Sequence, residues 1–216
     1  MANKIGIGIT STPNRVAHLH LCMDNIKKHS PDANVFVTVD YEGKGIAHAK
    51  NLCLKALKDC DYIFLFDDDC FPVKDGWVDF FINKSIETNE HHFLYLNRTH
   101  NRILTKNGLN IYKDCGGCMV FITQKVIKEV GGYYSGYGIY GFEHAGYSMR
   151  IFKGGLYTAP YICPVGANEY IYSLDMDLPR FDIKHHRSIP TAQCVRLINE
   201  NAQHFKEDIK EVFRAI

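Results

Sequence analysis

The fold is decided by the stretch Asp61-Tyr62-Ile63-Phe64-Leu65-Phe66-Asp67-Asp68-Asp69-Cys70-Phe71-Pro72. Its apolar half, residues 62–66, is typical of a strand that is buried on both faces of a parallel sheet. Three aspartates follow that strand directly. Because ligands of open α/β sheets bind beyond the carboxyl ends of the strands, we expect these aspartates to lie at a binding site.

Strand and helix patterns alternate on both sides of this stretch. The order β-α-β-α-β implies right-handed crossovers and a three-layer α/β fold. In the last predicted helix we expect Val195, Ile198, Ile209 and Phe213 to be the apolar anchors. Strands are predicted at 4–10, 34–40, 62–66, 93–96, 117–123 and once within 156–190, and helices at 16–26, 46–57, 77–86, 124–130, 143–152 and 192–215.

Composition and charge are those of an ordinary globular protein. Of the 216 residues, 46% are hydrophobic and 23% are charged, and the net charge of +1 argues against a bulk attraction to nucleic acid. No stretch approaches the ~18 apolar residues of a membrane span, and no secretory signal is visible. The eight cysteines are scattered, with Cys115 and Cys118 in the single CxxC pair. We interpret them as structural thiols in a reducing compartment.

The three aspartates repel one another, and a bound cation is the usual remedy. In an extended segment Asp67 and Asp69 point to one side and Asp68 points to the other. Asp67 and Asp69 are therefore candidate ligands of one Mg²⁺ or Mn²⁺ ion, with positions left for water and phosphate oxygens. From these residues alone, a solvated acidic turn that caps the next helix is the alternative.

Four motifs resemble, in the same order, those of GT-A glycosyltransferases of family 2 and of galactosyltransferase-like enzymes. Together they cover roughly residues 5–155, whereas the chain after Ile171 matches no part of that pattern. The motifs are the run Gly45-Ile46-Ala47-His48-Ala49-Lys50-Asn51-Leu52-Cys53-Leu54-Lys55-Ala56, the strand and D-x-D segment 61–72 followed by Trp77, the runs 116–121 and 130–133, and the run Gly138-Ile139-Tyr140-Gly141-Phe142-Glu143-His144-Ala145-Gly146-Tyr147-Ser148-Met149-Arg150.

The resemblance implies one α/β domain of the GT-A fold over residues 1–216, with a mostly parallel central sheet flanked by helices. Residues 1–115 would bind a nucleotide sugar, 116–190 would form the acceptor side, and 191–216 would form the C-terminal helix. The implied activity is that of a metal-dependent, hexosyltransferase-like glycosyltransferase. It would move a sugar from a nucleotide-diphosphate sugar, with a UDP-sugar expected, to a glycan or glycoprotein. The cofactor would be Mn²⁺ or Mg²⁺, which stabilises charge on the leaving nucleoside diphosphate.

The resemblance also implies roles for individual residues. Asp69 would coordinate the metal directly, Asp67 would bind the metal or the ribose, and His186 in the late tail would complete the metal shell. Because the chain has eleven histidines, a coincidental position of His186 is the alternative. The expected donor-binding residues are Thr10, Ser11, Thr12, Arg15, Asp40, Lys50, Asn51, Asp67, Asp68, Gly116, Gly117 and His144.

Several of these residues have plainer alternatives. Asp40 is otherwise a turn acid, and Arg15 is otherwise a solvated residue of the first helix. Lys50 and Asn51 would face one crevice, with Lys50 pairing either with Asp67 or with a phosphate. The two glycines would let the backbone approach a sugar, or they mark a bulge in a strand.

Glu143 is the candidate catalytic residue. In enzymes that invert the anomeric carbon, a carboxylate takes the proton of the acceptor hydroxyl as that hydroxyl attacks. Because Glu143 begins a predicted helix, helix capping is the alternative. His144 stands where the family pattern has Asp, and Gly146 stands where it has a second acid. This departure leaves His144 as a contact to the acceptor or the donor sugar.

Three other functions share parts of this pattern. A sugar nucleotidyltransferase normally has a Gly-rich basic loop after its first strand, where this chain has Thr-Ser-Thr-Pro-Asn-Arg over 10–15. A non-catalytic sugar-binding domain has no need of Asp67, Asp69 and Glu143. Transfer to modified DNA bases is less favoured by the near-zero net charge. Compact enzymes of the resembled kind occur in bacteria and large viruses. We therefore expect a cytoplasmic protein without a membrane span, in the host cytoplasm if it is viral.

Overall fold

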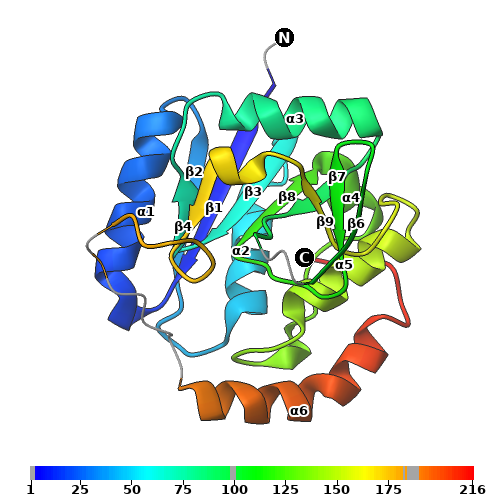
Figure 1. The fold of residues 1–216 in the computed structure, drawn as a ribbon. Coiled ribbons are helices and arrows are strands. Elements are labelled where there is room, and N and C mark those ends of the chain that lie inside the picture. Colours follow the sequence, from blue (N-terminus) through cyan, green and yellow to red (C-terminus); the bar gives the residue numbers. More distant parts are fainter. Residues whose placement is uncertain (1–2, 98–100, 182, 184–189) are drawn as a thin grey trace.

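The centre of the computed structural model is a five-stranded sheet (Figure 1). The structure describes residues 3–97, 101–181, 183 and 190–216. β1 runs parallel to β2 and β3, whereas β8 is antiparallel to both of its neighbours, β3 and β5. The mostly parallel sheet expected from the sequence is thus confirmed. In sheet order the strands are β2 (Asn34–Val39), β1 (Ile5–Ser11), β3 (Tyr62–Asp67), β8 (Met119–Thr123) and β5 (His92–Leu94).

Helices alternate with these strands as the sequence predicts, and one of them, 46–57, begins and ends at the predicted residues. None of the helices in the described ranges combines the length and apolarity that crossing a bilayer requires. The division of 1–216 into donor, acceptor and C-terminal parts stays a prediction. The helices are α1 (Val16–His29), α2 (Ile46–Leu57), α3 (Trp77–Thr88), α4 (Gln124–Glu129), α5 (Glu143–Lys153) and α6 (Thr191–Asp208), with 3-10 turns at Pro13–Arg15, Ser135–Tyr137 and Ala167–Glu169.

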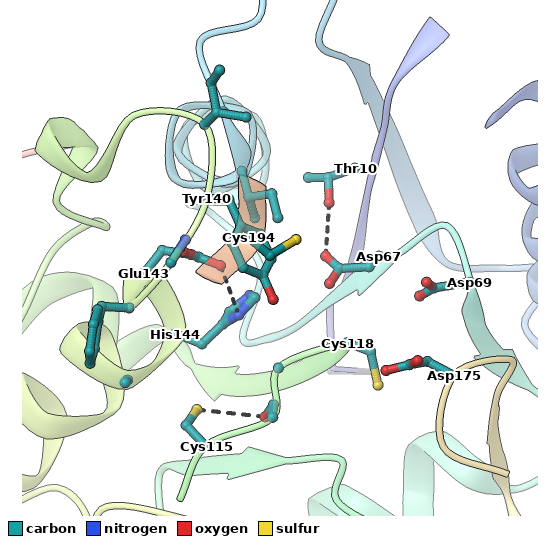
Figure 2. Close-up of a pocket in the computed structure, with 18 of the residues that line it drawn as sticks. Thr10, Asp67, Asp69, Cys115, Cys118, Tyr140, Glu143, His144, Asp175 and Cys194 are labelled. Atoms are coloured by element: carbon teal, nitrogen blue, oxygen red, sulfur yellow. Dashed lines mark hydrogen bonds and ion pairs between the residues drawn. The ribbon is translucent and has the colours of Figure 1, made fainter. Parts of the chain in front are cut away.

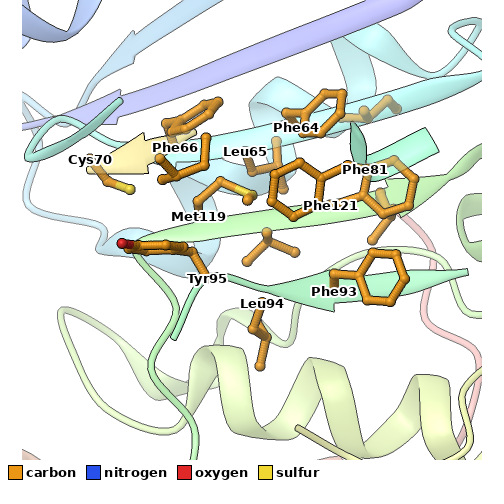
Figure 3. Close-up of a cluster of buried hydrophobic side chains, with 14 of the residues drawn as sticks. Phe64, Leu65, Phe66, Cys70, Phe81, Phe93, Leu94, Tyr95, Met119 and Phe121 are labelled. Atoms are coloured by element: carbon orange, nitrogen blue, oxygen red, sulfur yellow. The ribbon is translucent and has the colours of Figure 1, made fainter. Parts of the chain in front are cut away.

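The apolar half of β3 is the middle of the core. Residues 63–66 are completely buried, as a strand covered on both faces requires. The Phe64 ring packs against the rings of Trp77 and Phe121, at centroid distances of 4.6 and 5.1 Å. Figure 3 shows this aromatic layer, to which α3 contributes Phe81. The carboxyl end of β3, where the aspartates begin, is therefore fixed by the largest side chains of the core.

Close packing of α2 on β1 explains the alternating glycines of the first strand. A Cβ at Gly8 would lie 2.7 Å from the Cβ of Cys53 in α2 and 2.8 Å from Leu65 in β3. Such a distance is below any van der Waals contact, so only glycine lets the helix come this near to the sheet. This approach brings the N-terminal half of α2 to the aspartates.

Two small sheets lie beside the main one and are absent from the sequence prediction. β4 (Cys70–Pro72) pairs with β10 (Ile171–Ser173), and β6 (Arg102–Lys106), β7 (Leu109–Tyr112) and β9 (Ile162–Pro164) form the other sheet. A signal for the β6–β7 hairpin is present at Asn107-Gly108, which adopts φ values of +52° and +72°. Asn-Gly is the preferred pair of a two-residue hairpin turn.

The expected C-terminal helix is partly wrong. α6 ends at Asp208, seven residues earlier than predicted, and the side chains of Val195 and Phe213 are both 55% exposed. The buried residues of α6 are Cys194, Asn201 and Asp208. Apolar spacing misleads here because two of these buried residues are polar. Asn201 donates to the carbonyls of Tyr137 and Tyr140, and Asp208 lies 3.0 Å from Arg150 Nε.

Truncation of the core aromatic cluster tests this description. We expect Phe64→Ala to lower the free energy of unfolding by about 3–5 kcal/mol, because the cavity is lined by rings that cannot collapse into it. The matched control is Ile86→Ala on α3, where the side chain is 66% exposed and the change should stay within about 0.5 kcal/mol. Equal losses in denaturant titrations of the two variants would contradict the position of Phe64.

Candidate active site

A cavity of about 760 Å³ lies beyond the carboxyl ends of β1 and β3. Its lining includes the ends of these strands, the segment 113–118 before β8, and the segment 139–145 at the start of α5. Cys194, Ile198 and Phe205 of α6 also line the cavity. In Figure 2, Asp67 and Asp69 stand on one side of this space, and Glu143 and His144 stand on the other.

Asp67 is held by two neighbours at the end of β3. The Thr10 hydroxyl donates to Asp67 Oδ1 at 3.1 Å, and Lys50 Nζ lies 2.9 Å from the same oxygen. The Lys50 side chain is fully buried and also donates to the carbonyl of Gly117 at 3.4 Å. Burial raises the pKa of Asp67, and the ammonium of Lys50 opposes that shift. Lys50 thus pairs with Asp67, one of the two partners expected for it.

Asp68 follows the end of β3, lines the same cavity as Asp67 and Asp69, and is hydrogen-bonded by the protein. Ser11 Oγ donates to its Oδ2 at 2.5 Å, and Arg15 Nε donates to its Oδ1 at 2.7 Å. Burial raises the pKa of Asp68 to about 6, despite the hydrogen bond and charge of Arg15. Both oxygens of Asp68 therefore bind protein groups, and the contact to a donor expected for Asp68 stays a prediction.

Arg15 connects two of the aspartates. Its Nη2 lies 2.6 Å from Asp68 Oδ1 and 2.9 Å from Asp69 Oδ2, and its side chain is 7% exposed. The alternative that Arg15 is a solvated helix residue is therefore wrong. The guanidinium lines the cavity, where its charge would favour a diphosphate.

The carboxylates fit a hard divalent cation in their chemistry. Asp67 and Asp69 both line the cavity, and Asp175 joins them from the segment after β10. Within the described residues no group of three or more His, Cys, Asp or Glu side chains is arranged to hold a metal. Two carboxylates together with substrate phosphates are nevertheless a common set for Mg²⁺. His186, the expected third ligand, lies outside the described residues.

Four other residues that were expected to bind the donor line the cavity. Thr10, Ser11 and Thr12 line the cavity at the end of β1, and Asp40 lines it at the end of β2. Asp40 is also a turn acid, because its carboxylate accepts the backbone N–H groups of Lys44 and Gly45 at 2.9 and 2.6 Å. The turn role of Asp40 is thus confirmed, and its contact to a donor stays a prediction.

Neither Asn51 nor the fully buried Lys50 is among the residues that line the cavity, so the expectation that both face it is wrong. The side-chain amide of Asn51 donates to the carbonyl of Tyr133 at 2.9 Å and accepts the N–H of Tyr133 at 2.7 Å. Successive residues of a helix point in different directions, and Asn51 points to the turn before α5. It clamps that turn instead of contacting a donor.

The two glycines before β8 line the cavity. Neighbouring side chains leave no room for a Cβ at either position. A Cβ at Gly117 would overlap the His144 ring, and one at Gly116 would lie 2.8 Å from Leu96. The space beside Gly117 is therefore occupied by the ring of His144. This packing explains the glycine in a way that neither expected role, close approach to a sugar or a strand bulge, includes.

Glu143 begins α5 and is 5% exposed. Its Oε2 accepts the N–H of Gly141 at 2.7 Å, and its Oε1 lies 3.5 Å from Nδ1 of His144. Burial raises the pKa of Glu143, and burial lowers the pKa of His144 well below its usual value, so His144 is neutral. The Nε2 atom of His144 is buried without a hydrogen-bond partner in the part of the chain that the structure describes.

Sequence reasoning did not find the cavity residues contributed by α6. It also did not anticipate that Cys115, Cys118 and Cys194 line the cavity, although all eight cysteines are free thiols. For α6 a signal was available. Cys194, Ile198, Asn201, Phe205 and Asp208 recur at spacings of four and three residues, which defines one helix face.

The architecture is that of known glycosyltransferases. The chain aligns with a mannosyltransferase of Pyrobaculum calidifontis in complex with GDP-Man and Mn²⁺ at a TM-score of 0.58 and 13% identity, over 77% of this chain and 56% of that chain. The catalytic domain of Drosophila β1,4-galactosyltransferase 7, in complex with xylobiose, aligns at 0.50 and 17% identity, over 89% and 79%. A variant of that enzyme in complex with manganese, UDP-Gal and xylobiose aligns equally well. The chain has the GT-A fold.

The chain is also similar in sequence to a known protein. It is an uncharacterised glycosyltransferase of Acanthamoeba polyphaga mimivirus, 33% identical over 123 residues. The match covers 52% of this chain and 47% of that protein, so the chain spans about half the length of its relative. No protein-family model matches the chain.

Replacing the buried lysine tests its pairing with Asp67. We expect Lys50→Met to lower the free energy of unfolding by about 3 kcal/mol, because it leaves a largely buried carboxylate without its counter-charge. Lys55→Met, at an exposed position of the same helix, should change it by less than about 0.5 kcal/mol. If Lys50→Met were as stable as the control, Lys50 would be available for a phosphate instead.

Proposed function

We propose that this chain is a metal-dependent glycosyltransferase that moves a sugar from a nucleotide-diphosphate sugar to a hydroxyl of a glycan or glycoprotein. The observation that carries the proposal is that Asp67, Asp69 and Glu143 line one cavity of a GT-A fold. The mimivirus relative, named as a glycosyltransferase, and the nucleotide sugars bound by the structural neighbours support it.

The donor would occupy the side of the cavity formed by β1, β2 and β3. Hydroxyls of the segment 10–12 and the carboxylate of Asp40 line this side and suit a ribose and a base. The guanidinium of Arg15 would bind the diphosphate. We propose a UDP-sugar as donor, and the GDP-Man bound by the Pyrobaculum enzyme makes a GDP-sugar the comparison to test.

Asp67 and Asp69 would hold the divalent cation. When bound, Mn²⁺ or Mg²⁺ would neutralise charge on the donor diphosphate and on the leaving nucleoside diphosphate. The residues that contact the aspartates would hold them in place. Lys50 and Thr10 fix Asp67, and Arg15 fixes Asp68, so that the carboxylates are preorganised before a ligand arrives.

Glu143 would be the general base. Its carboxylate accepts the proton of the acceptor hydroxyl while that oxygen forms a bond to the anomeric carbon of the donor sugar. The bond from that carbon to the diphosphate oxygen breaks, and its electron pair leaves with the nucleoside diphosphate. Burial raises the pKa of Glu143, which makes its carboxylate a stronger base than a solvated one.

Donor binding should depend on the metal. We expect the affinity for UDP to fall roughly tenfold or more, about 1.4 kcal/mol, when Mn²⁺ is replaced by EDTA, because the diphosphate then faces unshielded carboxylates. Asp69→Asn should show the same weak binding with Mn²⁺ present, while Asp68 keeps Arg15 paired. Calorimetric titration measures both, and donor affinity that ignores chelation would refute the metal assignment.

The experiment that tests the function itself compares donors and products. UDP-sugars and GDP-sugars are screened with Mn²⁺ by thermal shift, since a ligand that binds the folded state raises the melting temperature. Release of nucleoside diphosphate from the best donor is then measured. Binding without any release would indicate a non-catalytic sugar-binding domain.

Glu143→Gln separates catalysis from helix capping. If Glu143 is the base, kcat should fall by roughly two to four orders of magnitude with donor affinity unchanged. The melting temperature should not fall, because the variant removes a buried charge and keeps the hydrogen-bonding shape. If Glu143 only caps α5, kcat should be retained and the loss should be about 1 kcal/mol of stability or less.

The pH dependence of the same pair of proteins is the control. The base must be ionised, so kcat/KM of the natural protein should fall as the pH falls through the raised pKa of Glu143, above the range of an ordinary glutamate. The residual rate of Glu143→Gln should lack this acidic limb. An identical limb in both proteins would assign it to another group.

A further inference from the structure

The helix α6 contacts the catalytic side of the cavity through a face that includes two buried polar side chains. Asn201 is 5% exposed and Asp208 is fully buried, on the face that also holds Cys194, Ile198 and Phe205. A buried amide or carboxylate costs free energy unless it is hydrogen-bonded, so the partners of these two residues show what α6 holds in place.

Asp208 anchors the end of α6 to α5. Its carboxylate lies 3.0 Å from Arg150 Nε and 2.9 Å from Arg214 Nε, and it accepts the Tyr137 hydroxyl at 2.8 Å. A Cβ at Gly146 would overlap Asp208 Oδ2. The position where the resembled pattern has a second acid is thus kept empty for a carboxylate that α6 supplies.

Asn201 grips the segment that leads into Glu143. Its side-chain Nδ2 donates to the carbonyl of Tyr137 at 2.7 Å and to the carbonyl of Tyr140 at 2.8 Å. The carbonyl of Tyr140 and the N–H of Gly141 belong to one peptide unit. That N–H donates to Glu143 Oε2 at 2.7 Å.

A peptide unit is planar, and in the trans form its C=O and N–H point in opposite directions. Fixing the carbonyl on the α6 side therefore fixes the direction of the N–H that Glu143 accepts. Hydrogen bonds arranged in a chain also polarise one another, which strengthens the N–H as a donor. One peptide plane thus connects Asn201 to the carboxylate of Glu143.

The segment needs such a restraint because its backbone is strained. Phe142 has φ = +69°, a conformation that costs roughly 1–3 kcal/mol for a residue with a side chain and persists only where the surroundings impose it. The Phe142 ring packs on the Phe205 ring of α6 at a centroid distance of 5.0 Å. Gly141 has φ = +108° and lies against Ile198. All three contacts come from one face of α6.

We propose that Asn201 is a positioning residue of the active site, which orients the carboxylate of Glu143 through the Tyr140–Gly141 peptide. The proposal rests on the proposed function of Glu143 as a base. It makes α6 part of the catalytic apparatus, although α6 lies at the edge of the molecule, away from the central sheet (Figure 1).

The test uses Asn201→Ala and Asn201→Asp in the full chain, with Val195→Ala at an exposed position of α6 as the control. Asn201→Ala should lower kcat by roughly ten- to a hundredfold, the scale of a misplacement of about 1 Å, with donor affinity unchanged. Asn201→Asp should lower kcat further, because a carboxylate would then face two carbonyl oxygens. Val195→Ala should match the natural protein. Loss of donor affinity in parallel with kcat would overturn the proposal, because it would indicate general disruption.

Two measurements separate positioning from support of the fold. In the Glu143→Gln background, Asn201→Ala should cause no further loss of kcat, whereas independent effects would multiply. Amide hydrogen exchange of Gly141 should speed up at least tenfold in Asn201→Ala while exchange in β3 is unchanged. Multiplying losses, or a Gly141 amide that stays protected, would overturn the positioning role. If Glu143→Gln alone keeps its turnover, the proposed function of Glu143 fails, and the Gly141 exchange result still decides the structural link.

Discussion

The structure depends first on how three adjacent carboxylates are tolerated at the end of a buried strand. Charges removed from water cost several kcal/mol each unless they are paired. Lys50 of α2 balances Asp67, and Arg15 balances Asp68 and Asp69. Arg15 follows β1, the strand next to β3, and Lys50 lies in α2, which follows β2 on the far side of β1. If α1 or α2 packed differently on the sheet, an aspartate would lose its cationic partner. The ion pairs of the site therefore also disfavour other arrangements of these helices.

Two glycines of the motifs show how tightly the site is built from its own side chains. Gly117 leaves room for the ring of His144, and Gly146 leaves room for the carboxylate of Asp208. Neither glycine has a positive φ value. At both positions the missing Cβ leaves space for a side chain from another part of the chain.

The parts of the fold that were predicted from the sequence are those with local causes. The apolar run 62–66 can only be a buried strand, and the helix 46–57 has a regular apolar face, so both lie where predicted. Asp67 and Asp69 share a cavity because they follow the carboxyl end of a buried strand, where ligands of α/β sheets bind, and Asp68 lines that cavity with them. The direction of Asn51 was not predictable in this way, since it depends on where the turn at Tyr133 packs, a contact 82 residues away.

The same distinction explains why the catalytic side depends on a helix that the motifs do not include. The run Gly141-Phe142-Glu143 identifies Glu143 as the candidate acid but does not determine its orientation. Phe142 adopts a strained φ value that no local sequence preference favours. The restraint comes from residues such as Asn201, about 60 positions later in the chain, through contacts that apolar patterning cannot reveal. The inward face of α6 combines apolar side chains with Asn201 and Asp208, so apolar burial alone does not fix its position. Hydrogen bonds and ion pairs with specific partners also fix it, and the hydrogen bonds of Asn201 carry the geometry of Glu143.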